Sequence, residues 1–359
     1  MDIDSRQAAK CCKVDVTSPR DRYIRQTLFF PAGEDAQERL HSASVLIIGC
    51  GALGTQSAEY LARAGVGHLR LVDRDVVEWS NLHRQVAFEE SDAEAQRAKA
   101  EALAERLRRV NSKIEIEART VDYNFSNCLE LAEDCSLIID GTDNLPTRFL
   151  INDVSLKLSI PWIYCGAIGG DGHVQFFSGR GGPCLRCQLP SLPPPGTLPT
   201  CETAGVIGPA AGVAASWQAV LAIRYLTTGE EEFVAGRKAM LSPWNVEARV
   251  AQMGGDAHCP TCVGKHLSYL EAAAGERVTT LCGRRAVQVL PPAQSGPGFD
   301  LSGIAARLDR LGDVRQHRSF LRFRGEGVLL TLFADGRAVF DGLTDRDEAR
   351  SLYARYVGQ

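Results

Sequence analysis

The sequence predicts an α/β protein with a doubly wound, mostly parallel sheet and a small C-terminal α+β module. Three observations carry this prediction. Apolar runs of strand length alternate with helical stretches through the first half of the chain, a glycine-rich turn joins the first run to a helix, and two later runs end in an aspartate. Alternation of this kind is typical of a parallel sheet whose ligands bind at the carboxyl ends of the strands.

The first strand is predicted at Val45–Ile48, directly before the turn GCGALG at Gly49–Gly54. A helix at Gln56–Ala64 and a strand at His68–Asp73 follow. Further helices are predicted at Ala95–Val110, Arg148–Leu158 and Ala210–Leu226, and further strands at Ile114–Arg119, Leu137–Asp140 and Trp162–Ala167. This order predicts a Rossmann-like sheet.

Composition indicates where the 359 residues divide. Residues 1–20 are expected to be a flexible polar tail, and residues 21–275 the main domain. Residues 276–299 hold a first strand and a linker, marked by PPAQSGPG. Residues 300–359 are predicted to form the α+β module, with helices at Leu301–Leu311 and Asp345–Tyr356, strands around 321–323 and 328–333, and a hairpin turn at 334–337.

Charge and hydropathy exclude several classes of protein. The net charge of −4 and the lack of a basic patch argue against nucleic-acid binding. No apolar stretch reaches about 18 residues, so no membrane span is expected. The N-terminus lacks the apolar region of a secretion signal. We therefore expect a cytoplasmic protein whose twelve cysteines stay reduced.

The glycine turn and the acid after it suit a nucleotide. Three glycines between a buried strand and a helix let the backbone approach a phosphate, whose charge then lies at the helix N-terminus. Asp73 lies about 20 residues further on, where a carboxylate accepts hydrogen bonds from a ribose. These two features alone fit a nicotinamide-dependent oxidoreductase as well as an ATP-binding enzyme.

Charged residues around the turn indicate a triphosphate with magnesium. Arg25, Arg84 and Lys99 would neutralise phosphates, and Asp143, just past a strand end, would hold Mg²⁺. Taken alone, each of them is more often a solvated surface charge. Together with the glycine turn they favour ATP·Mg, because a dinucleotide has little need of all of them.

Two Cys-x-x-Cys pairs suggest a metal. Cys184 and Cys187 form the first pair, and Cys259 and Cys262 form the second. Four thiolates suit tetrahedral zinc, and without an open coordination position the site should be structural, tying a loop region to the main domain. The alternative is a redox dithiol in one pair and an incidental second pair.

Cys201 lies outside both pairs, in a loop before an apolar helix. A thiol near a helix N-terminus can be a nucleophile, but most unpaired cysteines are small buried hydrophobes. Both interpretations stay open for Cys201. The cysteines predicted to be core residues are Cys50, Cys128, Cys135, Cys165 and Cys282, while Cys11 and Cys12 lie in the tail.

Several segments in a fixed order resemble the ThiF/MoeB/HesA adenylyltransferases, relatives of the ubiquitin-activating enzymes. They are Arg22–Gln26 (RYIRQ), GCGALG, Leu71–Asp75 (LVDRD), Asn81–Gln85 (NLHRQ), Gly141–Asn144 (GTDN) and the two Cys-x-x-Cys pairs. The resemblance covers roughly Asp21–Lys265, and the C-terminal module is similar to an extension of some bacterial members. The one departure is Ala52, which is often glycine in relatives.

The resemblance implies ATP·Mg-dependent activation of a small ubiquitin-like sulfur-carrier protein, whose terminal glycine carboxylate attacks the α-phosphate. Asp73 would hold the ribose and Asp143 the magnesium ion. Arg25 would reach into the partner subunit's site of a homodimer. In some members the cysteine at the position of Cys201 bonds covalently to the carrier. The whole expected nucleotide-binding set is Gly49, Gly51, Ala52, Gly54, Asp73, Ser80, Asn81, Arg84, Lys99, Asp143 and Asn144.

Such enzymes serve thiamine, molybdopterin and related thiolation pathways. No rhodanese-like domain is evident, so a separate protein is expected to donate the sulfur, and the proline-rich loop Pro183–Pro199 is expected to cover the carrier's tail. The alternatives are the oxidoreductase, a non-catalytic binding protein of the same fold, and an enzyme that adenylates a non-protein substrate such as a tRNA base.

Overall fold

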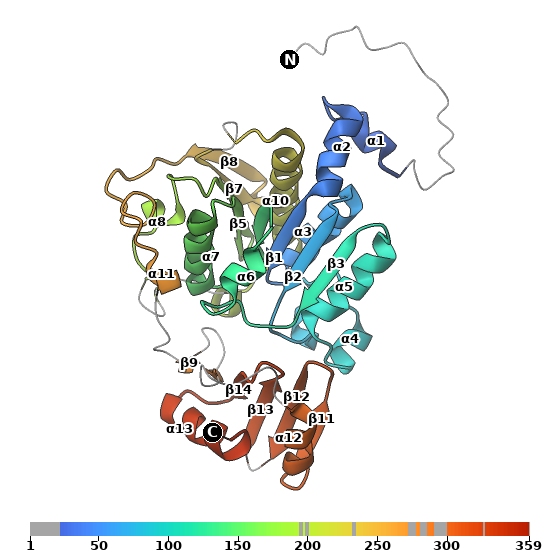
Figure 1. The fold of residues 1–359 in the computed structure, drawn as a ribbon, viewed down its shortest axis with the longest axis vertical. Coiled ribbons are helices and arrows are strands. Elements are labelled where there is room, and N and C mark those ends of the chain that lie inside the picture. The colour runs from blue at the N-terminus through green and yellow to red at the C-terminus, as the bar shows by residue number, and fades with distance from the viewer. Residues whose placement is uncertain are drawn as a thin grey trace.

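The computed structural model describes residues 22–193, 197, 201–231, 235–271, 278–280, 286–290, 300–325 and 327–358. The predicted tail at 1–20, the linker at 291–299, part of the proline-rich loop, and Cys11, Cys12 and Cys282 lie outside these ranges. The described chain forms an eight-stranded sheet and a six-stranded sheet. Figure 1 shows the smaller sheet, in red, below the larger one.

The larger sheet has a parallel part and an antiparallel part. Its strands lie in the order β3-β2-β1-β4-β5-β6-β7-β8. They are β1 (Ser44–Ile48), β2 (His68–Val72), β3 (Glu115–Arg119), β4 (Leu137–Asp140), β5 (Trp162–Ile168), β6 (Asp171–Phe177), β7 (Arg237–Ser242) and β8 (Glu247–Gln252). The first five run parallel, as predicted, and the last three are antiparallel. Because the winding reverses between β1 and β4, ligands of such a sheet bind at the carboxyl ends of these strands.

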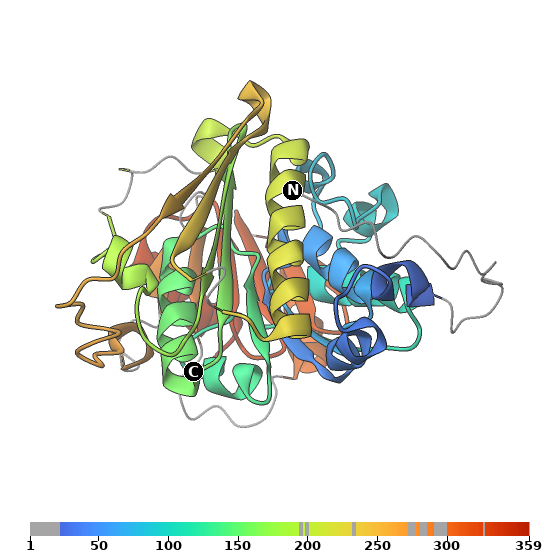
Figure 2. The ribbon, with the colours of Figure 1, turned by 90° about the horizontal axis from the view of Figure 1, so that it is seen from above.

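Helices cover both faces of this sheet (Figure 2). On one face lie α2 (Gly33–Ser42), α3 (Gly54–Ala64), α5 (Lys99–Val110) and α10 (Gly208–Thr228), and on the other α6 (Cys128–Ala132) and α7 (Leu145–Leu158). Val45 and Ile47 of β1 join the first layer, whereas Leu46 and Ile48 join the second. Burial on both faces explains the continuous apolar run of this strand. The short helices are α1 (Ile24–Thr27), η2 (Trp79–Asn81), α4 (Glu90–Glu94), α8 (Leu185–Gln188), α9 (Cys201–Ala204), η3 (Pro243–Asn245) and α11 (Ser268–Glu271).

Two features of the main domain differ from the prediction. The helix expected from Ala95 begins only at Lys99, because Gln96 has a φ of 48° and Ala98 forms a β-bridge with Val76. The strands β6, β7 and β8 have no counterpart among the predicted elements. β7 and β8 are partly or wholly exposed and lack a continuous apolar run. β6 is buried from Val174 to Phe177, but the polar Gln175 interrupts its apolar residues.

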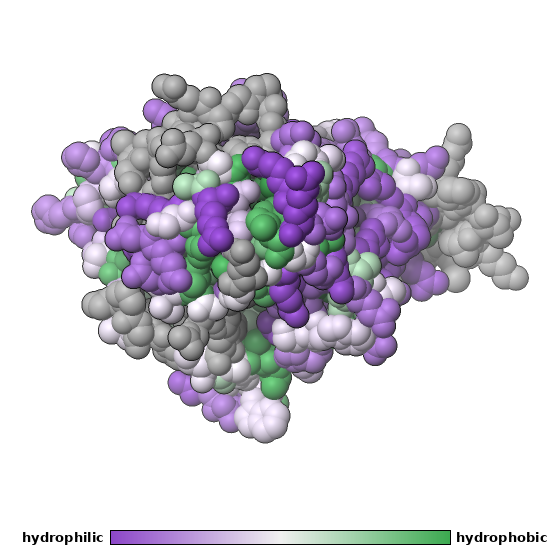
Figure 3. Space-filling view, turned by 90° about the horizontal axis from the view of Figure 1, so that it is seen from below, coloured by the Kyte–Doolittle hydropathy of each residue, from purple (hydrophilic) through white to green (hydrophobic). Residues whose placement is uncertain are grey.

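The C-terminal module is an antiparallel sheet in the order β11-β12-β13-β14-β10-β9 with two helices. Both predicted helices and the hairpin turn at 334–337 are present, although the first helix ends at Leu308 and not at Leu311 as expected. Seen from below, much of the surface is hydrophilic with scattered apolar side chains (Figure 3), because most large apolar residues of the module are buried. Its elements are β9 (Val278–Thr280), β10 (Ala286–Val289), α12 (Leu301–Leu308), β11 (Asp313–Gln316), β12 (Phe320–Gly325), β13 (Val328–Phe333), β14 (Ala338–Asp341) and α13 (Arg346–Tyr356).

Four cysteines predicted to be core residues, Cys50, Cys128, Cys135 and Cys165, are buried, which confirms that prediction for them. Among the helices of the described ranges, none combines the length and apolar character needed to cross a bilayer.

Candidate functional site

The three glycines of the turn after β1 have different surroundings. Gly49 has a φ of 90°, in the left-handed region that favours glycine. Gly54 packs so closely that an added Cβ would lie 1.8 Å from Gly49 O. Around Gly51, the atom nearest to such a Cβ is 3.8 Å away. Gly49 and Gly54 therefore close the turn, while Gly51 leaves space in which a ligand can approach the backbone.

Asp73, just after β2, is fixed by backbone N–H groups. One carboxylate oxygen accepts the Cys50 N–H at 2.6 Å, and the other accepts the Asp75 N–H at 2.7 Å. Burial raises the pKa of Asp73 above its ordinary value, while Lys99 opposes the rise. Since a carboxylate has about four lone-pair sites, this fixed group retains acceptor capacity for a ribose.

Lys99, the first residue of α5, lies beside these acids. Its Nζ is 3.5 Å from Asp75 Oδ2, and its side chain is only 9% exposed. The Lys99 N–H donates to Asp75 O at 2.9 Å, next to the bridge between Val76 and Ala98. Burial lowers the pKa of Lys99, but the carboxylates around it, Asp75 foremost, outweigh burial and raise it. Lys99 is therefore a buried cation near the glycine turn.

Asp143 lies exposed in the loop after β4. Its charge contributes to the raised pKa of Lys99, so the two side chains share one electrostatic environment. The next residue, Asn144, caps α7, because its Oδ1 accepts the Thr147 N–H at 3.0 Å. Asp143 thus offers an exposed carboxylate beside the start of α7, which the Asn144 cap stabilises.

The turn and the Asp143 loop meet through glycines. An added Cβ on Gly141 would lie 2.3 Å from Gly49 O, so the ends of β1 and β4 are in close contact. The structure therefore brings together the glycine turn, Asp73, Lys99 and Asp143 at the carboxyl ends of β1, β2 and β4.

A buried polar network, outside the predicted set of site residues, supports the Asp143 loop. Arg148 Nε donates to Asp140 Oδ2 at 2.9 Å, and Arg148 Nη2 donates to Thr142 O at 2.6 Å. Gln218 of α10 donates to Asp140 O at 2.9 Å and accepts the Ser57 hydroxyl at 2.7 Å. Because Asp140 is fully buried, the Arg148 guanidinium compensates its charge. The network joins α3, α7 and α10 to the end of β4.

The predicted phosphate contacts after β2 are themselves hydrogen-bonded. Asn81 is buried, and its Oδ1 accepts the Glu78 N–H at 3.2 Å. Arg84 Nη1 donates to Ser80 O at 2.7 Å, which folds the side chain back over η2. These three residues therefore lie in one short turn, while their contacts to a nucleotide stay a prediction.

Gln85 lies beside the glycine turn and is a further candidate site residue, although it is not in the expected nucleotide-binding set. It is 4% exposed, and its Nε2 is the nearest atom, at 3.8 Å, to an added Cβ on Gly51. Within the described ranges, its buried Oε1 has no hydrogen-bond partner. A buried amide oxygen without a partner next to Gly51 is available to a ligand. The sequence contained a signal for Gln85, because this residue ends the segment Asn81–Gln85, one of those that resemble the adenylyltransferase family.

Arg25 lies away from these residues. It is exposed on α1, where Gln26 Nε2 donates to Ala64 O at 2.9 Å and Tyr23 packs against Gly65. These contacts place α1 at the C-terminal end of α3, whereas the glycine turn lies at its N-terminal end. A helix of 11 residues is roughly 16 Å long. The structure therefore does not bring Arg25 to the glycine turn of its own chain.

Cys201 is the first residue of α9, of which the structure describes the backbone. After α9, Gly169 N donates to Gly205 O at 2.8 Å and Ile207 N donates to Gly169 O at 3.0 Å. These bonds hold the segment against the turn between β5 and β6. The nucleophilic role of Cys201 stays a prediction.

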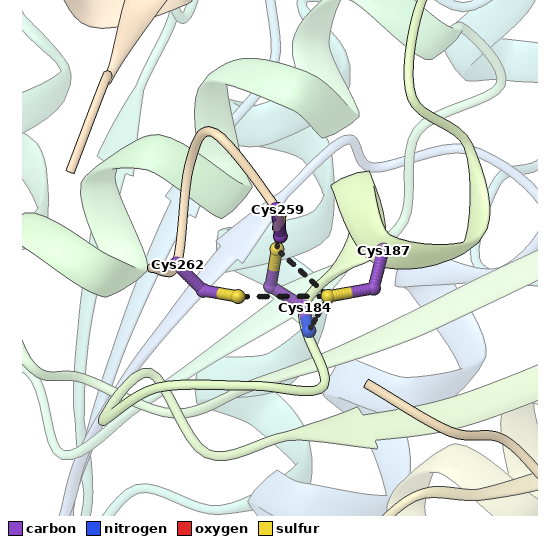
Figure 4. Close-up of side chains that lie close together, drawn as sticks. All are labelled: Cys184, Cys187, Cys259 and Cys262. Carbon is purple, nitrogen blue, oxygen red and sulfur yellow. Dashed lines mark hydrogen bonds between the residues drawn. The ribbon is translucent and has the colours of Figure 1, made fainter. Parts of the chain in front are cut away.

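The four cysteines of the two Cys-x-x-Cys pairs converge (Figure 4). Their Sγ atoms all lie within 4.8 Å of one another, with separations of 3.7 Å for Cys184–Cys259, 3.5 Å for Cys187–Cys262 and 4.0 Å for Cys184–Cys187. Four sulfurs about 2.3 Å from a tetrahedral zinc ion lie about 3.8 Å apart. The cluster therefore fits zinc, and it joins α8 to the segment before α11.

Comparisons with known proteins agree with this architecture. The ThiF family matches residues 23–261. The sulfur carrier protein ThiS adenylyltransferase of Bacillus subtilis is 38% identical over 94% of this chain and 99% of its own length. The sulfur carrier protein adenylyltransferase of Thermus thermophilus is 37% identical over 67% of this chain and 90% of its own length.

Other similar proteins match the main part of the chain. The adenylyltransferase and sulfurtransferase MOCS3-1 of Zea mays is 35% identical over 70% of this chain and 53% of its own length. Among solved structures, E. coli MccB covers 68% of this chain and matches over 75% of its own, with a TM-score of 0.60 and 22% identity. MccB therefore shares the fold.

Proposed function

The chain belongs to the ThiF family and is an adenylyltransferase, and from this premise we propose that it adenylates the C-terminal glycine of a small ubiquitin-like sulfur-carrier protein. The observation that carries the proposal is the meeting of an open glycine turn, Asp73, Lys99 and Asp143 at the carboxyl ends of three strands. A phosphate chain needs this combination of backbone N–H groups, a fixed cation and a metal-binding carboxylate.

The reaction needs positioning more than covalent help. A carboxylate oxygen of the carrier's last glycine attacks the α-phosphorus, the new P–O bond forms, and the bond to the bridging oxygen of the β-phosphate breaks. Pyrophosphate leaves with that oxygen and its electron pair. Lys99 suits this step because it is already desolvated and held by acids, so it meets the phosphates as a fixed charge. Arg84 adds a second cation near η2.

The nucleotide is proposed to lie along the glycine turn. Its phosphates approach the backbone at Gly51 and the N-terminus of α3, its ribose donates to Asp73, and the buried Oε1 of Gln85 accepts a hydrogen bond. Asp143 holds magnesium through its exposed carboxylate. Magnesium, when bound, neutralises phosphate charge. The remaining contacts are assigned to Gly49, Ala52, Gly54, Ser80, Asn81 and Asn144.

Arg25 is proposed to act in the partner subunit's site of a homodimer. The length of α3 keeps it from the turn of its own chain. Leu28 and Phe29, close to it in sequence, are 78% and 82% exposed, and Val213, Trp217 and Val220 form an exposed apolar row along α10. Large apolar patches on a surface mark protein interfaces. We assign these residues to contacts with a second copy of this chain.

The cysteine cluster is proposed to hold a structural zinc ion. With four protein ligands no position is open for substrate, so the ion would join the α8 loop to the rest of the domain. The proline-rich loop between this cluster and α9 is proposed to cover the carrier's tail. Cys201 is proposed to be a nucleophile: its thiolate would attack the carbonyl carbon of the carrier's acyl-adenylate, the bond between that carbon and the phosphate oxygen would break, AMP would leave, and a thioester would form.

The relatives favour a protein substrate. The Bacillus and Thermus enzymes are named for sulfur carriers, which argues against a tRNA base as substrate. Every curated relative reported above is named an adenylyltransferase, which argues against the oxidoreductase alternative. The proposed pathways are thiamine, molybdopterin and related thiolation, in the cytoplasm, with a separate protein as sulfur donor.

Exchange of labelled pyrophosphate into ATP tests this function. Wild-type protein with a carrier that ends in glycine should catalyse the exchange. Asp143→Ala should lower the rate by on the order of 100- to 1,000-fold, because it removes one group that acts on phosphate charge. The variant should melt at the wild-type temperature, since Asp143 is exposed. Retained exchange in Asp143→Ala would contradict the role of this carboxylate.

A further inference from the structure

The module's sheet is buried on both faces, although only one face is covered by its own helices. In a strand, alternate residues point to opposite sides. Leu321, Leu330 and Phe340 belong to the cluster that includes residues of α12 and α13. The residues of the opposite face that pack against Val76 and Ala98 of the main domain are Ala286, Phe320, Phe333 and Val339. The module therefore docks on the segment between Asp75 and Lys99.

Two module residues hold Arg74 from different directions. Arg74 Nη1 donates to Gln288 Oε1 at 2.9 Å and to Asp122 Oδ1 at 2.9 Å. Gln288 Nε2 donates to Asp122 Oδ2 at 3.2 Å, which closes a three-residue ring. Arg337 Nη2 donates to Arg74 O at 3.2 Å. Both the side chain and the carbonyl of Arg74 are therefore bound by the module.

Two further contacts extend this attachment along the main domain. Arg322 Nη2 lies 3.9 Å from Glu78 Oε1, and Ser319 Oγ donates to Glu101 Oε1 at 2.8 Å. Glu78 precedes η2, and Glu101 lies in the first turn of α5. The module thus contacts the segment between Asp75 and Lys99 just before η2, and it contacts α5 two residues after Lys99.

Arg337 is poorly suited to a purely stabilising role. It is 1% exposed and stacked on Phe333, with its guanidinium carbon 3.5 Å from the ring centroid. Its Nε and Nη1 have no hydrogen-bond partner among the described residues, and Nε only approaches Asp335 Oδ2 at 3.9 Å. Burial of a charge with unsatisfied donors is costly, and replacement by an apolar side chain is often neutral or stabilising. Its bond to Arg74 O points to a positioning role.

A contact to Arg74 can affect the site because Arg74 lies between Asp73 and Asp75 in the sequence. Both oxygens of Asp73 accept backbone N–H groups, one of them from Asp75. The Lys99 N–H in turn donates to Asp75 O at 2.9 Å. A shift of Arg74 would therefore move Asp73, Asp75 and Lys99 relative to the glycine turn.

We propose that the C-terminal module is a positioning element of the nucleotide site, in which Gln288 and Arg337 hold Arg74 and thereby set the affinity for ATP. The inference rests on the proposed function, because it takes ATP as the ligand of the glycine turn. It concerns binding and not the chemical step, since no module residue is placed at the reacting phosphorus.

Gln288→Leu in the full chain tests the inference. Leucine keeps the approximate size and removes both hydrogen bonds of the ring. The Kd of ATP, measured by calorimetry without carrier, and the KM of ATP in pyrophosphate exchange should both rise roughly 2- to 30-fold. The kcat and the KM of the carrier should stay close to wild type. Gln316→Leu, at an exposed glutamine of β11 in the same module, is the matched control and should change neither constant.

Arg337 supplies a second and independent variant. Arg337→Met should raise the Kd of ATP in the same range, and Arg337→Lys, which keeps a donor and the charge, should restore part of the affinity. If Arg337→Met fails to fold, the comparison of Gln288→Leu with Gln316→Leu decides the matter alone.

The outcomes separate this inference from the proposed function. Equal ATP affinity in wild type and Gln288→Leu, with exchange activity present, overturns the inference and keeps the function. Tight ATP binding that weakens in Gln288→Leu, without any exchange in wild type, overturns the proposed function and keeps the inference. A kcat that falls while the KM of ATP stays unchanged also overturns the inference.

Discussion

Gly51 and Gly54 lie three residues apart, but a side chain is excluded from the two positions for different reasons. At Gly54 the constraint is the fold, because Gly49 O occupies the place of a side chain. At Gly51 the free protein has room for a methyl group. The need for glycine there arises only when a phosphate approaches the backbone. Alanine substitutions at the two positions therefore separate folding from binding.

Gly54→Ala should lower the free energy of unfolding by about 1–3 kcal/mol or more, because helix α3 must move away from the strand end. Gly51→Ala should unfold like wild type, yet bind ATP on the order of 100-fold more weakly, since displacement of the phosphates by about 1 Å is costly. Chemical denaturation and calorimetry measure the two effects. A Gly51→Ala variant with wild-type affinity would show that the phosphates lie elsewhere.

The electrostatics of Lys99 predict how binding responds to pH. Burial by itself lowers the pKa of Lys99, but Asp75 and its neighbours raise it above the ordinary value of about 10.4. A raised pKa means that the cation and its stabilising contribution are fully present below that ordinary value. Both are lost only as pH rises through the higher folded value.

ATP affinity should therefore stay flat between about pH 7.5 and about pH 9.5, below the ordinary pKa of lysine. Lys99→Arg, which keeps its charge at every pH in this range, is the control and should give a parallel profile. Calorimetry across the range makes the comparison. A fall in wild-type affinity near pH 8.5 that is absent in Lys99→Arg would show that Lys99 loses its proton in the folded protein.

At the scale of elements, the parallel core is readable from the sequence, whereas its antiparallel edge is not. The strands β1 and β4 are buried on both sides and are continuous apolar runs, whereas β2 and β5 are largely apolar but include partly buried residues. The turns after these strands contain glycine and aspartate. β8 has almost no buried residue, so no local pattern marks it. Its position follows from pairing with β7, which is a tertiary effect.

The same distinction applies to the site. Gly49–Gly54, Asp73 and Asp143 stand directly at strand ends, so their convergence follows from the order of elements. The support of Asp140 by Arg148 and Gln218 depends on where α7 and α10 pack, and the attachment of Arg74 by Gln288 spans 214 residues. No local pattern in the sequence specifies contacts of that separation.

The cysteine cluster joins two loops that have little regular structure, so zinc should contribute directly to their folding. Cys259→Ser should bind less than one zinc ion per chain, whereas wild type should bind about one. Its melting temperature should fall. Cys128→Ser, which changes a buried cysteine outside the cluster, is the control and should keep its zinc. Metal analysis of protein purified under reducing conditions would contradict the site if wild type contains no zinc.

At the scale of the whole molecule, Arg25 predicts active sites shared between two subunits. Arg25→Ala and Asp143→Ala should each exchange pyrophosphate far more slowly than wild type when assayed alone. After mixing and subunit exchange, about half the dimers are mixed, and each mixed dimer has one site with both residues intact. Pyrophosphate exchange should then recover to about a quarter of the wild-type rate. No recovery in dimers shown to be mixed would place Arg25 in the site of its own chain.

The central claim is that this chain forms an adenylate on the terminal glycine of a sulfur carrier. The most direct test is the intact mass of candidate carriers after incubation with the enzyme, ATP and magnesium. The carrier should become heavier by one adenylyl group only when its C-terminal glycine is present, and Asp143→Ala should form far less of this product than wild type. ATP bound by the enzyme with every candidate carrier left at its original mass would contradict the claim.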